Sequence, residues 1–343
     1  MIKAGAATAW SSYVALFQGA FYDPNLANQG TGQVFYPLSE TLLVAAPLIL
    51  AGLSVALAFR AGLFNIGAQG QFIFGAIGAS YVGFTYELPA LLHITVATLF
   101  GVFLAGIYGG IVGLLKAKTG AHEVIVTIML NYVASYLLLW LLKTDRFLRE
   151  GRSDPIAPDI VDSARLPKIF GSEFRVSIAI IVALLVAWFI SFLLNRTTLG
   201  FRFRAVGANA FAARTAGMSV AFATTAVMIV SGALAGLGGA MNVLGGEYAL
   251  TVGVAGSFGF DAITVALLGR ARPLGVVLSA LLFSALRVGG QMMQARTETP
   301  LDIVLVIQAL IILFIAAPAL VKAVFRLKNI NASSGMAAKG WNG

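Results

Sequence analysis

The sequence predicts an all-α polytopic membrane protein with about eight full transmembrane helices and one short crossing or half-helix. Of the 343 residues, 59% are hydrophobic and only 11% are charged, whereas a soluble domain has about 25% charged residues. The mean hydropathy is +0.90. Apolar runs of about 20 residues, the length that crosses a hydrocarbon core of about 30 Å, recur along the chain.

The predicted elements follow one another with few polar interruptions. Residues 1–34 contain no apolar run of spanning length and form a separate N-terminal segment, while the transmembrane domain is expected over 35–328. Its full spans are expected at 36–59, 63–85, 89–115, 122–142, 176–194, 220–244, 272–291 and 301–325. The run 256–269 is too short to cross straight through and is expected to form half a helix. The polar tail 329–343 is expected to be disordered.

The basic residues predict one orientation. The loop 195–219 contains Arg196, Arg202, Arg204 and Arg214 and no acidic residue, which places it in the cytoplasm by the positive-inside rule. The stretch 143–175, with seven basic and six acidic residues, then falls outside. The same reasoning predicts a cytoplasmic C-terminus.

The inner part of the basic loop is predicted to be a helix of its own. Asn209 is a suitable N-cap for residues 210–216, and Gly217 can adopt the left-handed conformation that closes a helix. Such a helix can dock onto a cytoplasmic partner, or its arginines can anchor the neighbouring spans to lipid headgroups. These residues alone leave both interpretations open.

Polar side chains at membrane depth mark a candidate pathway. The segment GLFNIGAQGQ (62–71) contains Asn65, Gln69 and Gln71 among three glycines, which predicts an irregular helix that lines a cavity. The alternative is that these amides cross-link neighbouring helices. Asp261 is open to the same two interpretations, because an acid at a helix centre costs about 2.5–3.5 kcal/mol on insertion scales. Glu123 is expected instead to stabilise a helix N-terminus.

Small residues predict where helices approach closely. Gly109 and Gly113 form one small-xxx-small pair, and Gly232 and Gly236 form another. This spacing lets helix backbones pack closely together in lipid, so we interpret the role of these glycines as structural.

Several classes of function are excluded. The chain has no cysteine, and His93 and His122 are too few and too far apart for a histidine-rich metal site. No phosphate-binding loop and no hydrolase motif is present, so we expect no catalytic residue and no ATP site in this chain. The net charge of +9 is explained by the cytoplasmic loops and anionic lipid, without a nucleic-acid partner.

Five stretches resemble the permease subunits of ABC importers in the family that serves branched-chain amino acids, ribose-type sugars and nucleosides. RAGLFNIGAQGQ (60–71) and HEVIVTIMLNY (122–132) are similar to its nucleoside branch, whose importers use basic membrane lipoprotein-type binding proteins. RAVGANAFAARTAG (204–217) resembles the ATPase-coupling loop of the wider family. The other matches lie at 259–289 and 305–317, so the resemblance covers about residues 40–325.

The resemblance implies the helical ABC importer permease fold and a bacterial inner or plasma membrane location. It implies a second permease subunit, expected to form a heterodimer, two cytoplasmic ATPase subunits that bind the ATP, and an extracellular or periplasmic substrate-binding lipoprotein. The residues that match the coupling segment are Arg204, Gly207, Asn209, Phe211, Ala212, Ala213, Arg214 and Gly217.

The first helix, the solute and the class of transporter stay open. Such permeases usually begin with a further membrane helix, so residues 1–34 are expected to be a truncated first-helix region. The alternatives to nucleosides are sugars or branched-chain amino acids as solutes. An ion-coupled secondary transporter is the rival from another class, and it would use Glu40, Glu123 or Asp261 as its coupling carboxylate.

Overall fold

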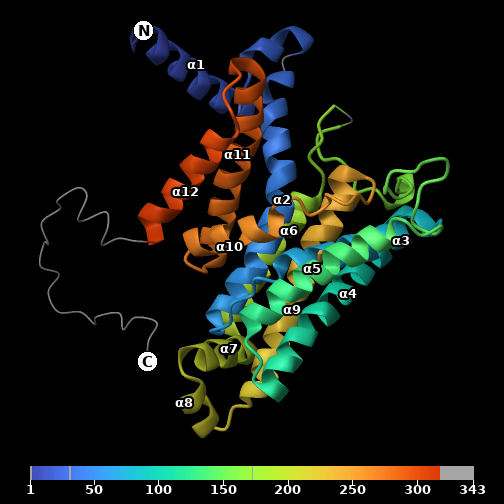
Figure 1. Ribbon diagram of the computed structural model, residues 1–343, viewed down its shortest axis with the longest axis vertical. Helices are drawn as coiled ribbons and strands as arrows, with labels where there is room; N and C mark the ends of the chain where they lie inside the picture. The colour runs from blue at the N-terminus through green and yellow to red at the C-terminus, as the bar shows by residue number, and fades with distance from the viewer. Residues whose placement is uncertain (1, 31, 172, 317–343) are drawn as a thin grey trace, which may run out of the picture.

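The fold is built from helices that cross one another at different angles (Figure 1). The computed structural model describes residues 2–30, 32–171 and 173–316. The α-helices in these ranges are α1 (Ile2–Ala20), α2 (Tyr36–Arg60), α3 (Ala68–Thr85), α4 (Ala90–Thr119), α5 (Glu123–Leu141), α6 (Ala179–Arg196), α7 (Thr198–Ala208), α8 (Ala210–Thr215), α9 (Val220–Asn242), α10 (Phe258–Leu268), α11 (Pro273–Thr297) and α12 (Asp302–Ala316). Short 3₁₀ helices cover Pro24–Gln29, Gln33–Phe35 and Asp162–Ala164, and a π-helix covers Val243–Glu247. The described residues form two isolated β-bridges and no strand, which confirms the all-α prediction.

Helices α2 and α9 form the centre of the molecule. Helix α9 packs against α2, α3 and α4, and α2 also contacts α6, α10 and α11. In its most apolar stretch α2 is 78% buried, whereas the corresponding stretch of α5 is only 22% buried. The outer helices therefore keep many large apolar side chains exposed, as expected for surfaces that face lipid or another subunit.

The α4–α9 contact depends on glycine. A Cβ atom added to Gly109 would lie 2.4 Å from the carbonyl oxygen of Met228, and one added to Gly232 would lie 2.4 Å from that of Ala105. Both distances are far below van der Waals contact, so the two backbones touch where these glycines cross. This confirms the close packing predicted for the pairs Gly109/Gly113 and Gly232/Gly236.

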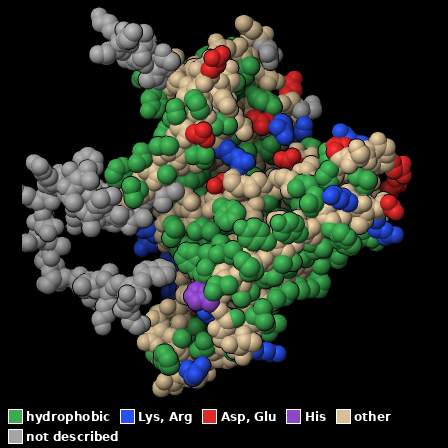
Figure 2. Space-filling view, in the orientation of Figure 1, with side chains coloured by type: hydrophobic (Ala, Val, Ile, Leu, Met, Phe, Trp, Pro, Cys, Tyr) green, Lys and Arg blue, Asp and Glu red, His purple; other side chains and the backbone are tan. Residues whose placement is uncertain are grey.

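The two ends of the molecule differ in charge. Helices α7 and α8 lie at the lower end in Figure 1, and the segment between α5 and α6 lies toward the opposite end. On the face shown in Figure 2, acidic side chains are seen in the upper part and at the right edge, and only basic ones toward the lower end. This asymmetry agrees with a cytoplasmic lower end.

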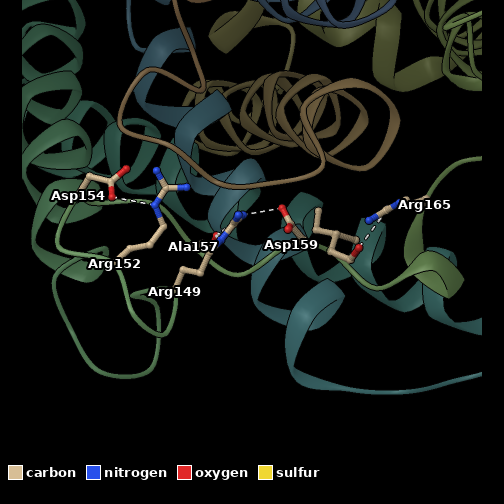
Figure 3. Close-up of polar contacts among 7 residues, drawn as sticks. Arg149, Arg152, Asp154, Ala157, Asp159 and Arg165 are labelled. Atoms are coloured by element: carbon tan, nitrogen blue, oxygen red, sulfur yellow. Dashed lines mark hydrogen bonds and ion pairs between the residues drawn. The ribbon is translucent and has the colours of Figure 1, made fainter.

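The segment 143–175 folds back over the loop that follows α9. Backbone N–H groups of Ala157 and Ile160 donate to the carbonyl oxygens of Leu250 and Tyr248, both at 2.9 Å. Figure 3 shows its ion pairs, in which Arg149 bridges the carbonyl oxygen of Ala157 and the carboxylate of Asp159. Three ion pairs thus join residues within this segment: Arg149–Asp159, Arg152–Asp154 and Arg165–Asp162.

Helix α1 is held against α11 by a buried ion pair. Asp23, which follows α1, pairs with Arg296 in the last turn of α11, and Asn25 donates two hydrogen bonds to its carboxylate. Burial raises the pKa of Asp23, but the contacts with Arg296 and Asn25 together hold this pKa below its ordinary value. The carboxylate is therefore charged at neutral pH. Helix α1 lies in the region 1–34, for which a truncated first helix was expected.

One predicted span needs a correction, and another is described only in part. Six described helices are long and apolar enough to cross a membrane: those containing α2, α4, α5, α6, α9 and α11. The expected span 63–85 is shortened, because its helix begins only at Ala68 and is not among the six. Helix α12 is described only to Ala316, so the rest of the expected span 301–325 and the tail 329–343 lie outside the described residues. The half-helix expected at 256–269 is present as α10.

Candidate functional site

The predicted irregular segment lies between α2 and α3. Residues 61–67 form turns without regular helix, and most of them are buried. Asn131 of α5 satisfies two backbone groups here: its Oδ1 accepts from the N–H of Gly70 at 2.8 Å, and its Nδ2 donates to the carbonyl oxygen of Ile66 at 2.9 Å. Irregular backbone is tolerated at membrane depth when it is buried in protein and hydrogen-bonded. The break in the helix predicted from the amides and glycines is confirmed.

Asn65 and Gln71 form a buried cross-link. Their side-chain amides bond reciprocally, with the Asn65 Nδ2 donating to Gln71 Oε1 at 2.8 Å and Gln71 Nε2 to Asn65 Oδ1 at 3.2 Å. Asn65 also donates to Ser231 of α9 at 2.8 Å, and Ser231 donates to the carbonyl oxygen of Ser54 in α2 at 2.8 Å. Neither amide faces the cavity described below. The contacts are those of the cross-linking alternative, and their role in a pathway remains a prediction.

Gln69 connects α3 to the start of α10. Its Nε2 donates to the carbonyl oxygen of Gly256, and its Oε1 accepts from the N–H of Gly259, both at 2.8 Å. Close packing supports this contact, because a Cβ atom on Gly259 would lie 2.3 Å from the Gln69 Cα. Gln69 therefore fixes the turn from which α10 begins.

Replacing Gln69 by leucine should reduce transport several-fold without preventing assembly. The variant leaves the N–H of the buried Gly259 without its partner, a loss of about 1–3 kcal/mol, whereas the carbonyl of the exposed Gly256 can bond to water instead. Uptake and subunit co-purification would be measured together, with Gln294→Leu, an exposed glutamine of α11, as the matched control. Wild-type uptake by the Gln69 variant would contradict the positioning role.

Asp261 lines a cavity of about 300 Å³ between α2, α10, α11 and α12. Five of the lining side chains are polar or charged: Ser257, Asp261, Arg287, Gln291 and Gln308. The Ser257 hydroxyl donates to Asp261 Oδ2 at 2.6 Å, and Arg287 Nη1 lies 3.8 Å from the same oxygen. The Arg287 guanidinium carbon lies 5.0 Å from the centroid of the Phe258 ring. Of the four predicted pathway residues, Asp261 is the one that faces this cavity.

The basic loop contains two helices at the end of the molecule. Thr197 accepts from the N–H of Gly200 at 3.1 Å and begins α7, a helix that was not predicted. Asn209 accepts from the N–H of Ala212 at 3.0 Å and begins α8, which ends at Thr215. Gly217 has a φ of 79°, the left-handed value predicted for it.

Helix α8 presents an apolar side chain to solvent. Phe211 is 84% exposed, whereas Ala213 on the other face is buried. Arg214 and Arg204 lie exposed nearby in sequence, and Ala212 donates the capping hydrogen bond to Asn209. A capped helix with an exposed aromatic ring and basic flanks suits a protein partner.

The end of α2 connects the basic loop to the turn between α10 and α11. Gly207 of α7 packs on the end of α2, where a Cβ atom would lie 2.5 Å from the carbonyl oxygen of Arg60. The Arg60 side chain continues the connection, with its Nε donating to the carbonyl oxygen of Ala271 at 2.9 Å. Ala271 lies in the turn between α10 and α11, with a φ of 49°. The loop, α2 and the two cavity-lining helices are therefore joined in one path of contacts.

Three important residues were missed in the sequence. Arg287 is the fifteenth of the 25 residues of α11, and an arginine inside an apolar span is itself a signal of function. Arg60 follows an apolar span, a position typical of an arginine that only marks the cytoplasmic end of a helix. Asn131 lies in a quoted motif, but its partners are 61 and 65 residues away in sequence, which no local pattern reveals.

Comparison with known proteins places the chain among transport proteins. The sequence model of the family described as "Branched-chain amino acid transport system / permease component" matches residues 38–316. The chain is 41% identical over 315 residues to the guanosine ABC transporter permease NupP of Bacillus subtilis, covering 90% of this chain and 85% of the relative.

Two further relatives have similar coverage. The glucose ABC transporter permease TsgB13 of Haloferax volcanii is 35% identical over 82% of this chain and 76% of its own. The nucleoside ABC transporter permease NupB of Lactococcus lactis is 33% identical over 88% of this chain and 85% of its own. The guanosine permease NupQ of Bacillus subtilis and the nucleoside permease NupC of Lactococcus lactis also match, at 30% and 28% identity. No solved structure matches.

Proposed function

This chain belongs to the branched-chain amino acid transport permease family, and we propose that it is the membrane-spanning permease subunit of an ABC importer of nucleosides. The observation that carries the solute class is the 41% identity, over nine-tenths of the chain, to a permease whose name specifies guanosine. The nucleoside permease NupB supports the same class. The glucose permease TsgB13, at 35% identity, makes a sugar the second candidate.

ATP-dependent transport would require partners that bind the nucleotide. We assign α8 and its flanking residues to the docking of a cytoplasmic ATPase, together with Arg204 of α7: Asn209, Phe211, Ala212, Ala213, Arg214 and Gly217. Gly207 of α7, which packs on the end of α2, is assigned to coupling rather than to docking. The support is the 84% exposure of Phe211 at the basic end of the molecule. A single exposed aromatic anchor is the type of side chain that dominates docking energetics. The arginines add steering for an acidic groove.

A second, related permease is the proposed partner within the membrane. The Bacillus and Lactococcus relatives occur as pairs of permeases, NupP with NupQ and NupB with NupC, and both members resemble this chain. We therefore propose a heterodimer in a bacterial inner or plasma membrane, with the C-terminus in the cytoplasm. A substrate-binding lipoprotein would deliver the solute at the end that carries segment 143–175.

The geometry disfavours an ion-coupled secondary transporter. Each of the three carboxylates that such a transporter would use has a basic partner: Glu40 with Arg175 at 3.1 Å, Glu123 with Lys116, and Asp261 with Arg287. Glu123 also occupies the first position of α5, where an acid was expected to stabilise the helix start. A carboxylate held closely by a cation, as at Glu40 and Glu123, is poorly suited to bind and release a proton or a sodium ion.

Nucleosides should stimulate ATP hydrolysis by the complete transporter with its binding protein. The reason is that the liganded binding protein favours the state in which the ATPase subunits close. The measurement compares guanosine, adenosine and uridine with glucose and leucine at equal concentrations. Stimulation by glucose or leucine with nucleosides inert would overturn the nucleoside assignment.

A further inference from the structure

The cavity next to Asp261 combines features of a solute-binding site. It lies between α2, α10, α11 and α12 and has a volume of about 300 Å³, at the small end of the range for ligand pockets. Apolar side chains such as Leu48 and Phe283 form part of its wall, and polar groups from three different elements converge on it. An apolar pocket with a few convergent polar groups is the usual form of a small-molecule site.

The charges in this cavity cancel. Arg287 lies well inside α11, where an unpaired guanidinium would be costly, and Asp261 is the acid that faces it. The pair is loose, at 3.8 Å, and both side chains remain about one-third exposed. Among the described residues, the guanidinium contacts Asp261, the Ser257 hydroxyl at 3.4 Å and the Phe258 ring. Most of its five donors are therefore available to a solute or to water.

The surrounding groups determine which solute fits. Gln291 and Gln308 offer both donors and acceptors, the carboxylate of Asp261 accepts, and Arg287 donates. An uncharged solute that has hydroxyl groups and a ring rich in nitrogen and oxygen atoms can form hydrogen bonds with all four of these side chains. An anionic solute would approach Arg287 only by placing its charge next to the Asp261 carboxylate, which repels it.

The ring of Phe258 holds the arginine in place. It stacks on Phe72 of α3 at 5.3 Å with an interplanar angle of 14°, and its other neighbour is the Arg287 guanidinium at 5.0 Å. Gln69 holds the backbone on both sides of Phe258 through its hydrogen bonds with Gly256 and Gly259. Arg287 is thus presented to the cavity by a rigid stack and not by a mobile side chain alone.

We propose that this cavity is a binding site for uncharged polar solutes within the membrane domain, with Arg287 and Asp261 as specificity-determining residues. The inference rests on the proposed function, because it assigns the nucleoside to a place in the permease itself. It adds that the permease, and not only a binding protein, rejects charged relatives of the solute such as nucleoside monophosphates.

The test measures binding of labelled guanosine to the complete transporter in lipid nanodiscs without the binding protein. We expect weak, saturable binding that unlabelled adenosine or guanosine displaces and guanosine monophosphate does not. Arg287→Gln and Asp261→Asn should each weaken binding at least tenfold, since each leaves the partner charge uncompensated. The exchanged pair Asp261→Arg with Arg287→Asp should recover part of the binding because the charges cancel again.

Controls separate recognition from folding. Gln308→Leu changes no charge and should also weaken guanosine binding, while the ATPase continues to co-purify. Arg165→Gln removes a comparable arginine from the exposed pair with Asp162 and should leave binding unchanged. The proposal is overturned if a wild-type transporter that takes up nucleosides binds no guanosine in this assay, or binds it equally well in the Gln308, Arg287 and Asp261 variants. Absence of ATP-driven nucleoside uptake by the wild type would instead reject the proposed function.

Discussion

Replacing Phe211 by alanine should release the ATPase from the transporter and abolish ATP-driven uptake. The ring is 84% exposed on α8, so its removal costs little within this chain, and its expected pocket is in the partner. Truncating a packed aromatic anchor typically costs about 2 kcal/mol or more, which weakens docking about 30-fold. Co-purification of the ATPase and uptake into proteoliposomes would be measured on the same preparations.

A matched control distinguishes docking from general loss of apolar surface. Leu91, near the start of α4, is 83% exposed and is 120 residues before Phe211 in the sequence. Leu91→Ala should retain the ATPase and transport normally. If Phe211→Ala also retains both, the loop serves only as a lipid anchor.

Replacing Gly207 by alanine should leave the ATPase docked but should interrupt the path of contacts from α7 through α2 to α10 and α11. The added Cβ atom would lie 2.5 Å from the carbonyl oxygen of Arg60 and 2.8 Å from the Ala61 Cα. These are backbone atoms, so α7 must move away from the end of α2 and from the contact between Arg60 and Ala271. The helix that carries Phe211 is unchanged. We expect the ATPase to remain bound while uptake falls at least tenfold.

The measurement is uptake per molecule of ATP hydrolysed, because a broken mechanical link leaves hydrolysis running without transport. Gly253→Ala is the control, since a Cβ atom at Gly253 meets no atom within 4 Å. Normal coupling in the Gly207 variant would show that the path from α7 through Arg60 to α10 and α11 is not used.

The parts that could be predicted from the sequence are those fixed by local interactions. The N-cap at Asn209 and the left-handed Gly217 each bond to a group three residues away, and both are found as predicted. The glycine pairs of α4 and α9 were found because their spacing reflects a single helix face. The break before α3 follows in the same way from amides and glycines that lie together in the chain.

The remaining features depend on contacts between distant segments. Ser54 and Ser231 are 177 residues apart, and Gln69 and Gly259 are 190 residues apart, so their pairing requires the folded arrangement. The role of Arg60 could not be predicted for the same reason, because its hydrogen-bond partner, Ala271, lies far away in the sequence. Asn65 and Gln71 show the limit of composition: amides at membrane depth indicate a polar contact, but only the fold shows whether they face a cavity or each other.

The central claim is that this chain carries nucleosides through the membrane at the expense of ATP hydrolysed by its partners. The direct test is uptake of labelled guanosine into proteoliposomes that contain this chain, the second permease, the ATPase subunits and the binding protein. We predict uptake against a concentration gradient that stops when ATP, the ATPase or the binding protein is omitted. Uptake that continues without ATP and follows a proton or sodium gradient would contradict the account.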